Sequence, residues 1–506
     1  MSSLNQLRPH QQAALDGLRD SLRSGHRRPM LSLPTGSGKT VIAAHIVTGA
    51  LRKGNRVAFI VPMLSLIDQT FERFIENGID PGDMGVIQGD HEWYRPHAPI
   101  QICSAQTLAR RGMPDASVIV VDEAHIRDAK LHSWLASEAS KSAIAIGLSA
   151  TPWSRGLGRI YDDLISPITI RELIGQKYLS DFRVFAPSHP NLEGVKIDAK
   201  SGDFQTGELS DRMSAPTLVA DIVTTWLERA ENRPTLCFGV DRPHAALIAE
   251  QFANAGVSTA YVDANTPREE RSEIAKRFQA GEIKVVCNIA TMTTGIDLDV
   301  RCLILARPTK SEILFTQIIG RALRPAEDKD HALILDHSDT HLRLGLVTDL
   351  GRDALDDGKP GAGESKPRYE KSVLPKECTS CGCLVPVGVK ECPNCGFVMK
   401  RACGVEHLDG ELVELGSRQK SRKSGKTCAR DRLLEMGKEH IFAQIESIRL
   451  KRGRSPGWTA HLYRDITGVW PRGVSNARPE EPSLELQSFI RHRDLAWAKS
   501  KRRSAA

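Results

Sequence analysis

Short apolar runs alternate with segments of helical periodicity over two long stretches of the chain. In the first stretch, residues 28–175, the apolar runs are RVAFIVP (56–62), PIQICSA (99–105), ASVIVVDEAH (116–125) and SAIAIGLSAT (142–151). Segments with apolar residues at helical spacing, such as SLIDQTFERFIENG, separate these runs. Continuous apolar strands that alternate with helices are typical of a parallel sheet covered by helices on both faces.

The same alternation returns in residues 215–345. The strand-like runs there are RPTLCFGV, VSTAYVD, IKVVCNIA and RCLILAR. The helical segments RPHAALIAEQFANAG and PREERSEIAKRFQAG each stop at a glycine, which is a common helix end. The pattern therefore predicts an α/β fold with two tandem parallel-sheet domains of similar size.

The composition changes after residue 350. The segment DALDDGKPGAGESKPRYEKS (353–372) is rich in Gly, Pro and charged residues, which is typical of a linker, and a cysteine-rich module and a basic region follow it. The predicted division is a nucleotide-binding domain (1–175), a connector (176–212), a second domain (213–350), a linker (351–375), a cysteine module (376–400) and a basic, mainly helical C-terminal region (401–506).

Charge is distributed unevenly over the 506 residues, whose formal net charge is +7. Residues 400–506 hold 23 Lys and Arg against 13 Asp and Glu, a balance of +10, which leaves about −3 for the first 399 residues. A basic region on a near-neutral body favours a polyanionic partner, although a solvated tail that only aids solubility has the same composition. No apolar run approaches a membrane span and MSSLNQLRPH is unlike a secretion signal, so we expect a cytoplasmic protein without membrane contact.

The first chemical motif is LSLPTGSGKT (31–40). A Gly-rich loop between a strand and a helix lets successive backbone N–H groups converge on phosphate oxygens. Lys39 is then expected to meet the β- and γ-phosphates, and Thr40 to offer its hydroxyl to Mg²⁺. Leu33 stands where the strict pattern has Gly. The loop residues predicted to contact the nucleotide are Pro34, Thr35, Gly36, Ser37, Gly38, Lys39 and Thr40.

The second motif ends the apolar run VIVVDEAH (118–125). Two adjacent carboxylates at the end of a buried strand favour a hard cation, because unpaired carboxylates near a core are costly. We expect Asp122 to hold Mg²⁺ and Glu123 to orient and deprotonate an attacking water. The alternative interpretation is an acidic cluster that only starts a helix.

The third motif, QIIGRALRP (317–325), places arginines in a mostly apolar segment of the second domain. Arg321 and Arg324 are three residues apart and therefore share one face of the predicted helix. Phosphoryl transfer spreads negative charge over the γ-phosphate, which arginines from another domain can stabilise. We therefore predict a nucleotide lodged between the two domains. A pair of arginines in surface salt bridges would explain neither Gln317 nor Gly320.

In this order, the motifs from residue 8 to residue 325 resemble those of superfamily 2 helicases of the DEAD/DEAH type. Within that superfamily the chain is most similar to the bacterial RadD-like branch and related phage helicases, through LRPHQQAALDGL, the Leu before PTGSGKT, LSATPWSRGLGRIY and MTTGIDLDVRCLILARPTKS. The similarity covers about the first 400 residues and implies two RecA-like lobes that hydrolyse ATP between them. It does not extend to the spliceosomal RNA helicases.

The resemblance also implies roles for individual residues. The implied catalytic set is Lys39, Asp122, Glu123, Gln317, Arg321 and Arg324. The element LRPHQQAAL implies nucleotide contacts by Arg8 and Gln11, and ATMTTGIDLD implies further contacts by Gly295 and Asp297. Residues implied to couple hydrolysis to lobe movement are His125, Ser149, Ala150 and Thr151. Residues implied to grip a nucleic-acid strand are Pro62, Gln106, Thr107 and Thr291.

The cysteine module reads CTSCGCLVPVGVKECPNCG (378–396). Two CxxC pairs separated by ten residues fit a tetrahedral four-thiolate zinc site, so the predicted Zn²⁺ ligands are Cys378, Cys381, Cys392 and Cys395. Cys383 competes with Cys381 as a ligand and Cys403 is a spare; we expect neither to bind the metal. The module is either purely structural or a docking surface.

Aromatic and basic residues are interleaved in SPGWTAHLYRDITGVWPRG (455–473). Aromatic rings beside guanidinium groups can stack on bases and follow phosphates, which makes Trp458, Tyr463, Arg464 and Trp470 candidate nucleic-acid contacts. The alternative is that the rings pack the core of a small helical domain.

These features together predict an ATP-dependent DNA helicase or translocase that couples ATP hydrolysis between two lobes to movement on DNA or its unwinding, in repair, recombination or phage replication. The expected cofactors are ATP, Mg²⁺ and Zn²⁺. DNA is favoured over RNA as the partner, with replication or recombination proteins as further partners of a monomer. The alternatives are an RNA helicase, a duplex translocase that does not separate strands, and a non-enzymatic nucleic-acid scaffold.

Overall fold

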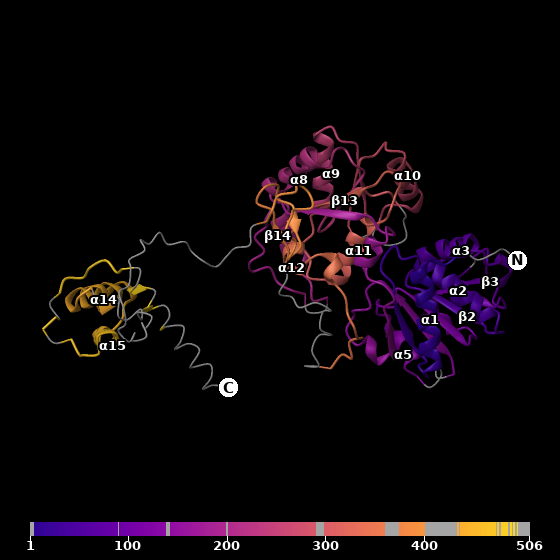
Figure 1. Ribbon diagram of the computed structural model, residues 1–506, viewed down its shortest axis with the longest axis horizontal. Helices are drawn as coiled ribbons and strands as arrows, with labels where there is room; N and C mark the ends of the chain where they lie inside the picture. Colours follow the sequence, from indigo (N-terminus) through magenta and orange to yellow (C-terminus); the bar gives the residue numbers. More distant parts are fainter. Residues whose placement is uncertain are drawn as a thin grey trace, which may run out of the picture. The chain divides into compact units, whose positions relative to one another are not determined.

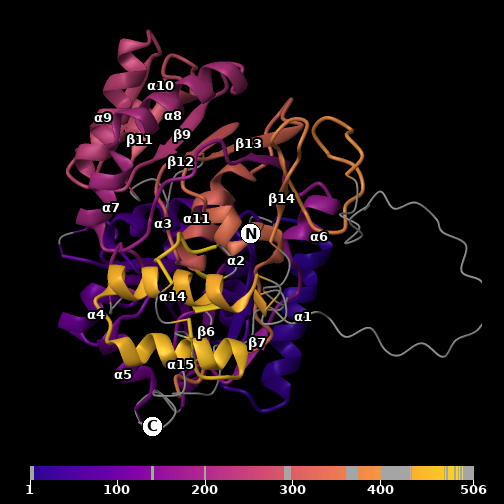
Figure 2. The same cartoon turned by 90° about the vertical axis from the view of Figure 1, so that its left-hand side faces the viewer.

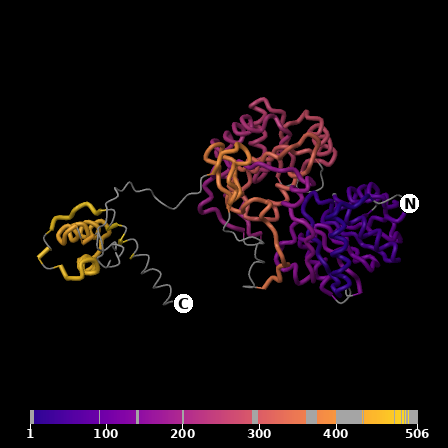
Figure 3. The backbone as a smooth tube through the Cα atoms, in the orientation of Figure 1, coloured from indigo at the N-terminus to yellow at the C-terminus, as the bar shows by residue number. Residues whose placement is uncertain are grey.

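The computed structural model describes residues 5–89, 91–137, 142–198, 201–289, 298–359 and 374–399, and in the C-terminal region residues 433–434, 436–471, 473–474, 477–483, 486–487, 489–490 and 493. The chain forms two compact units, Met1–Ala402 and Cys403–Ala506. Figure 3 traces the backbone of both units in the colours of the sequence. The predicted nucleotide or strand contacts Thr291, Gly295 and Asp297, as well as Cys403, lie outside the described residues.

The first lobe is built on a seven-stranded parallel sheet in the order β3-β4-β2-β5-β6-β1-β7. Its strands are β1 (Pro29–Ser32), β2 (Val57–Val61), β3 (Met84–Ile87), β4 (Ile100–Ser104), β5 (Val118–Asp122), β6 (Ile144–Ser149) and β7 (Asp163–Ile165). Its helices, drawn mainly in indigo in Figure 1, are α1 (Pro9–Arg23), α2 (Lys39–Leu51), α3 (Ile67–Glu76), α4 (Ala105–Arg111) and α5 (Ala129–Leu135). Every residue of β2 and β4 is buried, as expected for strands covered on both faces.

The strand order places the two charged motifs of the first lobe at one edge of the sheet. β1 leads into the Gly-rich loop and β5 ends at Asp122, and β6 lies between these two strands. The carboxyl ends of parallel strands meet at the same edge, which is where ligands bind in open α/β sheets.

The second lobe is built on a six-stranded parallel sheet in the order β10-β11-β9-β12-β13-β8. Its strands are β8 (Asp181–Phe185), β9 (Thr235–Phe238), β10 (Thr259–Val262), β11 (Val285–Asn288), β12 (Cys302–Leu305) and β13 (His331–Asp336). Its helices are α6 (Ile170–Gly175), α7 (Thr206–Met213), α8 (Pro216–Arg229), α9 (Arg242–Asn254), α10 (Arg268–Gln279), α11 (Glu312–Ala322) and α12 (Thr340–Leu344), followed by the 3₁₀ helix η6 (Val347–Asp349). Helix α9 packs against β10 and β11 (Figure 2). The prediction of two parallel-sheet α/β domains is confirmed.

The boundaries of the second lobe differ from the predicted ones. Ile168, Ile170 and Leu173 belong to the core of the second lobe, so the chain leaves the first lobe soon after β7 rather than at residue 175. The predicted connector 176–212 contains β8, which pairs with β13 as an edge strand of the second sheet. Both differences have the same cause. The apolar residues of residues 168–185 are buried against elements of the second lobe that follow later in the chain.

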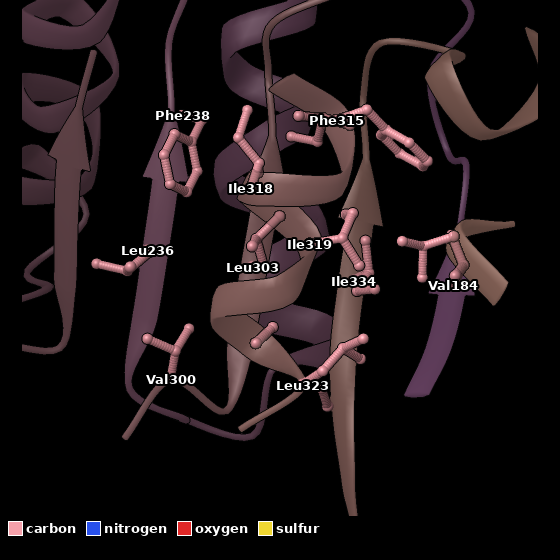
Figure 4. Close-up of a cluster of buried hydrophobic side chains, with 14 of the residues drawn as sticks. Val184, Leu236, Phe238, Val300, Leu303, Phe315, Ile318, Ile319, Leu323 and Ile334 are labelled. Carbon is pink, nitrogen blue, oxygen red and sulfur yellow. The ribbon is translucent and has the colours of Figure 1, made fainter. Parts of the chain in front are cut away.

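Helix α11 lies on the second sheet by one apolar face. Ile318, Ile319 and Leu323 pack over Leu303 of β12 and Ile334 of β13 (Figure 4). Its first turn is capped by the Ser311 hydroxyl, which accepts a hydrogen bond from the Leu314 amide at 3.2 Å. This packing fixes the orientation of the helix and turns Gln317 and Arg321 toward the first lobe, as the contacts below establish.

The cysteine module is joined to the edge of the second sheet. β14 (Lys376–Glu377) and β15 (Leu384–Val385) form an antiparallel hairpin. Cys383 forms an isolated bridge with Phe185 of β8, and the Arg183 guanidinium donates to Asn394 Oδ1 at 2.8 Å. Val385 is buried in a cluster that also holds Phe185 and residues of β9 and β12. The hairpin therefore covers the otherwise open edge strand β8.

The C-terminal unit has its own small core. Helices α14 (Lys438–Arg452) and α15 (Pro456–Thr467) pack against each other around Ile441, Ile445, Leu462 and Tyr463. None of the helices in the described part of the chain combines the length and the apolar character that spanning a membrane requires.

Candidate active site between the two lobes

Glycines shape the loop that follows β1. Gly36 and Gly38 have φ of 83° and 84°, in the left-handed region that favours glycine. A Cβ at Gly38 would lie 2.2 Å from Gln11 Nε2, and one at Gly36 would lie 2.6 Å from Leu179. The carbonyl of Ser37 accepts a hydrogen bond from Gln11 Nε2 at 3.0 Å and lies 2.9 Å from His10 Nε2. The loop is therefore held from behind by α1, and α2 begins directly after Gly38.

Lys39 joins the loop to the two carboxylates. Its Nζ lies 2.9 Å from Asp122 Oδ1 and 2.5 Å from Glu123 Oε1. Burial alone would lower the pKa of Lys39, but the charges of Asp122 and Glu123 outweigh it and raise that pKa, so the ammonium stays charged. Burial would raise the pKa of Glu123, but the Lys39 charge keeps it below its ordinary value. Glu123 is thus an anion at neutral pH.

Glu123 also has an unusual backbone and an unsatisfied oxygen. Its φ is 47°, which is uncommon for a residue other than glycine and points to a functional constraint. Oε2 is buried, accepts no hydrogen bond from the described residues and lies 3.4 Å from His125 Nδ1. A buried carboxylate oxygen without a donor is suited to accept a proton or a hydrogen bond from a bound ligand or water.

His125 contacts Ser149, another predicted coupling residue of the first lobe, and Gln317 of the second lobe. Burial lowers the pKa of His125 to about 4, so the ring is neutral at physiological pH. Its Nε2 lies 3.0 Å from Gln317 Nε2 of α11 and its Nδ1 lies 2.9 Å from Ser149 Oγ. Gln317 Nε2 can only donate, so His125 Nε2 is the acceptor and the ring proton is assigned to Nδ1, which donates to Ser149. Ser149 Oγ also accepts from the Thr151 amide at 3.0 Å.

Helix α11 approaches the loop at Gly320. A Cβ at this position would lie 2.9 Å from the Cβ of Thr35, so glycine is required for the close approach. Arg321, one residue further on, is buried, and its charge contributes to the lowered pKa of Glu123. Arg324 lines the same cavity, but it lies beyond the end of α11, not on it as predicted. Lys329 explains this end, because its ammonium donates to the carbonyls of Ala322 and Arg324 at 2.6 and 2.7 Å.

These groups surround one cavity of about 400 Å³. Its charged and polar lining comes from both lobes. It includes the predicted residues Arg8, Thr35, Lys39, Thr40, Asp122, Glu123, Gln317, Arg321 and Arg324, and also Gln69, Thr70 and Arg73 of α3, which no motif predicted. Tyr178 also lines it, and the Arg8 guanidinium lies 4.6 Å from the centre of the Tyr178 ring. Sequence reasoning missed Tyr178 because it follows α6 outside every motif. Gln11 is buried and caps α1 through the Arg8 amide at 2.9 Å, so it shapes the loop from behind.

The four predicted metal ligands gather in the cysteine module. The four sulfur atoms all lie within 4.8 Å of one another and could hold a metal ion; they belong to Cys378, Cys381, Cys392 and Cys395. Cys383 is not part of this set: it is fully buried, and its Sγ lies 3.7 Å from the Leu384 carbonyl oxygen. Its thiol therefore belongs to the core that joins the hairpin to β8.

The predicted strand-gripping residues lie at the ends of neighbouring strands in the first lobe. Pro62 follows β2, and Gln106 and Thr107 begin α4 directly after β4, the neighbour of β2. Gln106 is exposed and the other two are half-buried. A surface at the carboxyl edge of the sheet is thus available to a ligand, and whether a nucleic acid binds there stays a prediction.

The aromatic residues of the C-terminal unit fall into two groups. Tyr463 is 2% exposed and packs edge-on against Phe442, as the alternative interpretation of a ring in the core of a small helical domain expects. Trp458 is partly buried against the same core. Trp470 is exposed. The His461 ring lies edge-on to it with 5.2 Å between the ring centres, and the Arg464 guanidinium lies 4.7 Å from the centre of the Trp470 ring. Only this outer group remains a candidate contact.

Comparison with known proteins matches both lobes. Residues 4–154 match the family described as type III restriction enzyme, res subunit, and residues 217–326 match the helicase conserved C-terminal domain. The chain is 31% identical to IRC3 of Saccharomyces cerevisiae, whose name describes a proposed ATP-dependent helicase, over 65% of this chain and 51% of IRC3. It is 26% identical to the DNA 3'-5' translocase XPB2 of Sulfurisphaera tokodaii, over 61% of this chain and 77% of that protein. The chain therefore spans about half the length of IRC3.

The fold is shared with a solved restriction-enzyme structure. A fragment of an HsdR-type subunit of a type I restriction enzyme from Vibrio vulnificus superposes with a TM-score of 0.53 and 22% identity, covering 71% of this chain and 68% of the fragment. At this identity the likeness concerns the fold alone.

Proposed function

Because the chain belongs to superfamily 2 of the helicases, we propose that it is an ATP-dependent DNA helicase or translocase that hydrolyses ATP between its two lobes. One observation carries the proposal: Lys39, Asp122 and Glu123 of the first lobe face the same cavity as Gln317, Arg321 and Arg324 of the second. A cavity with a lysine, two carboxylates and arginines from an opposing wall has the groups that phosphoryl transfer requires.

The first lobe would bind and activate the substrate. The amides of the Gly-rich loop and Lys39 would hold the phosphates, and the half-exposed Arg8–Tyr178 pair would stack on the adenine base. Thr40 and Asp122 offer the oxygen ligands that Mg²⁺ prefers, and the ion would neutralise phosphate charge when bound. Glu123, an anion with a buried unsatisfied oxygen, would accept the proton of the attacking water.

The second lobe would stabilise the charge that develops on the γ-phosphate. Arg321 and Arg324 would approach the γ-phosphate from the opposing wall. Gln317 Nε2 lies 3.0 Å from His125 Nε2, so a movement of Gln317 in the site would change its contact with His125. From His125 the hydrogen bond to Ser149 leads to the segment after β6. Changes in these contacts during the ATP cycle would alter how the lobes grip a strand at Pro62, Gln106 and Thr107.

The cysteine cluster would bind Zn²⁺. Four thiolates at this spacing form a closed tetrahedral site, as in structural zinc sites. The hairpin is short and has little apolar core of its own, so metal binding would contribute much of its folding free energy.

The experiment that tests the proposal is ATP hydrolysis by Glu123→Gln in the presence and absence of DNA. Loss of the general base should lower the DNA-stimulated kcat about 100-fold or more, while ATP still binds. Glu273→Gln, at an exposed position of α10, is the matched control and should keep full activity. A Glu123→Gln protein that hydrolyses ATP at the normal rate would refute the assignment.

The same assay decides among related activities. Stimulation by single-stranded or forked DNA above that by RNA supports a DNA motor, and the reverse order identifies an RNA helicase. Triplex displacement without strand displacement identifies a duplex translocase. A complete absence of ATP hydrolysis with every polymer would leave only a binding function and overturn the proposal.

A further inference from the structure

We propose that residues 351–358, here called the return strap, position α11 against the first lobe, with Arg352 and Asp356 as its positioning residues. The inference rests on the proposed function, because α11 carries the groups that would act on the γ-phosphate. No sequence motif lies in the strap, and composition alone predicts a linker there. The described contacts instead attach it to both lobes.

The strap is a second covalent crossing between the lobes. The chain first passes from the first lobe to the second between Ile165 of β7 and Ile168 in the second core. After η6, whose Val347 lies in that same core, the chain returns, and Leu355 packs against the first-lobe cluster that contains Leu157 and Tyr161. Two bodies joined at two separate points can hinge about the line through those points, but they cannot swivel freely.

Arg352 connects the start of α11 to the first lobe. Its guanidinium forms a salt bridge with Glu312, the first residue of α11, and lies 5.4 Å from the centre of the Trp153 ring. The Arg352 and Glu312 side chains are only 11% and 16% exposed, so the pair is largely shielded from water. Removal of one partner of such a pair leaves an uncompensated charge, which is costly.

The contacts of Arg352 complete a ring that includes the candidate active site. Trp153 follows the predicted coupling segment Ser149–Thr151, and the next residue, Ser154, donates its hydroxyl to the His125 carbonyl at 2.7 Å. The ring of His125 contacts Gln317 at 3.0 Å, and Gln317 lies on α11 with Glu312. The helix is therefore held to the first lobe at its N-terminus through Arg352 and at its middle through His125.

Asp356 fastens the other end of the strap. Its Oδ1 accepts hydrogen bonds from the amides of Gly156 and Gly358 at 2.8 and 2.7 Å, and its carbonyl accepts from the Gly158 amide at 2.7 Å. Arg159 Nε donates to the Asp357 carbonyl at 2.6 Å. A Cβ at Gly158 would lie 3.1 Å from the Asp356 carbonyl oxygen, so the glycine allows this close contact. The strap is thus anchored to the loop that follows Trp153.

A strap that only adds packing would behave differently from one that positions α11. Passive packing would affect the free energy of unfolding alone. A positioning strap affects the rate of the chemical step, because a small displacement of the arginines weakens the stabilisation of the transition state more than it weakens ATP binding.

The test is a charge exchange between Arg352 and Glu312, measured by DNA-stimulated ATP hydrolysis of the full chain. We expect Arg352→Glu to lower kcat about 10- to 100-fold with little change in KM for ATP. The double variant Arg352→Glu/Glu312→Arg should recover part of the lost kcat, because it restores the ion pair but not the contact of the Arg352 guanidinium with the Trp153 ring. Arg277→Ala, which removes an exposed arginine that pairs with Glu282, is the matched control and should be unchanged.

Asp356→Asn provides an independent variant if Arg352→Glu fails to fold. It weakens the anchor of the strap and should lower kcat in the same direction, with the thermal midpoint of unfolding nearly unchanged. The proposal is overturned if a folded Arg352→Glu or Asp356→Asn protein turns over normally while Glu123→Gln is inactive, or if the exchanged pair recovers nothing. Normal turnover by Glu123→Gln would instead overturn the proposed function.

Discussion

One parallel strand in each lobe ends on an aspartate, and the two carboxylates have very different surroundings. Asp122 ends β5 in the first lobe and Asp336 ends β13 in the second. Asp336 is fully buried, and each of its oxygens accepts two hydrogen bonds: Oδ1 from the amide and hydroxyl of Ser338, Oδ2 from the amide and ring of His341. Burial would raise the pKa of Asp336, but these donors lower it to about 2.

Asp122 has a movable cation where Asp336 has fixed donors. Its Oδ1 accepts one fixed hydrogen bond, from the Glu123 amide at 2.9 Å, and its other partner is the flexible Lys39 side chain, also at 2.9 Å. The Asp122 side chain is 22% exposed and lines the cavity. A carboxylate whose hydrogen bonds all come from neighbouring residues of its own turn is committed to the fold. A carboxylate paired with one lysine at a cavity can exchange that partner for a ligand. An aspartate at the end of a strand therefore indicates a ligand-binding site only where a ligand can displace its hydrogen-bond or ion-pair partners.

Exchange of each aspartate for asparagine is the strongest test of this difference. Asp336→Asn should lower the free energy of unfolding by about 3–5 kcal/mol, because it removes the charge of a buried, fully hydrogen-bonded group. Asp122→Asn should leave that free energy nearly unchanged and abolish ATP hydrolysis. Denaturant unfolding and phosphate release, measured on both variants, check this expectation, with the exposed Asp211→Asn as control.

Similar losses of stability in the two aspartate variants would break the comparison, because both carboxylates would then serve the fold. An Asp336→Asn protein with an unchanged free energy of unfolding would also contradict the comparison, because Asp336 would then not be needed for the fold.

Removal of the metal ion that we propose for the cysteine cluster should sharpen the contrast between the lobes, since the cysteine hairpin covers only the second sheet. Leu384 and Val385 of β15 are buried, so loss of the hairpin from β8 should cost about 2 kcal/mol, roughly the burial of one large apolar side chain. A chelator or Cys378→Ser should therefore lower the unfolding temperature of the second lobe and leave ATP contacts of the first lobe intact. Differential scanning calorimetry with and without chelator measures the shift.

Cys383→Ala is the matched control for the metal experiment. Its thiol lies in the core and not in the four-sulfur cluster, so this variant should remain sensitive to the chelator. A Cys383→Ala protein that no longer responds to the chelator would show that Cys383 is a ligand.

Acid should act on one buried histidine in each lobe, and its effect over a single pH unit should be the smallest of these changes. Burial lowers the pKa of both His125 and His244 to about 4, below the ordinary value of about 6.5, so the unfolded chain binds the extra proton. The stabilisation from each neutral ring is complete above about pH 6.5 and is lost as the pH falls toward about 4, at no more than about 1.4 kcal/mol per pH unit.

Asparagine at either histidine should flatten this pH dependence, which urea unfolding at several pH values measures. Only His125→Asn should also reduce ATP hydrolysis, because only His125 contacts Gln317. Equal loss of hydrolysis in His244→Asn would place both histidines in the same functional network.

Much of the candidate chemistry of the protein could be predicted from the amino-acid sequence. The Gly-rich loop, the carboxylates after β5 and the paired CxxC motifs each depend on local geometry, because left-handed glycines, strand ends and tight turns are determined by a few adjacent residues. The alternation of apolar and polar positions likewise predicts two parallel sheets, since the period of a strand or helix is a local property.

Other features depend on residues that are far apart in the chain. β8 belongs to the second sheet only because β13 pairs with it. Tyr178 faces the cavity because Arg8 lies across from it. Tyr463 is buried because Phe442 and the other residues of the C-terminal core pack around it.

The amino-acid sequence by itself therefore determined the fold class, the order of the motifs and the types of chemical group in the candidate site. Only the tertiary structure decided which groups face each other, where the lobes begin and end, and that residues 351–358 return to the first lobe. The physical reason is that propensity and periodicity act over a few residues, whereas burial and hydrogen-bond partners are shared between segments that meet only in the folded chain.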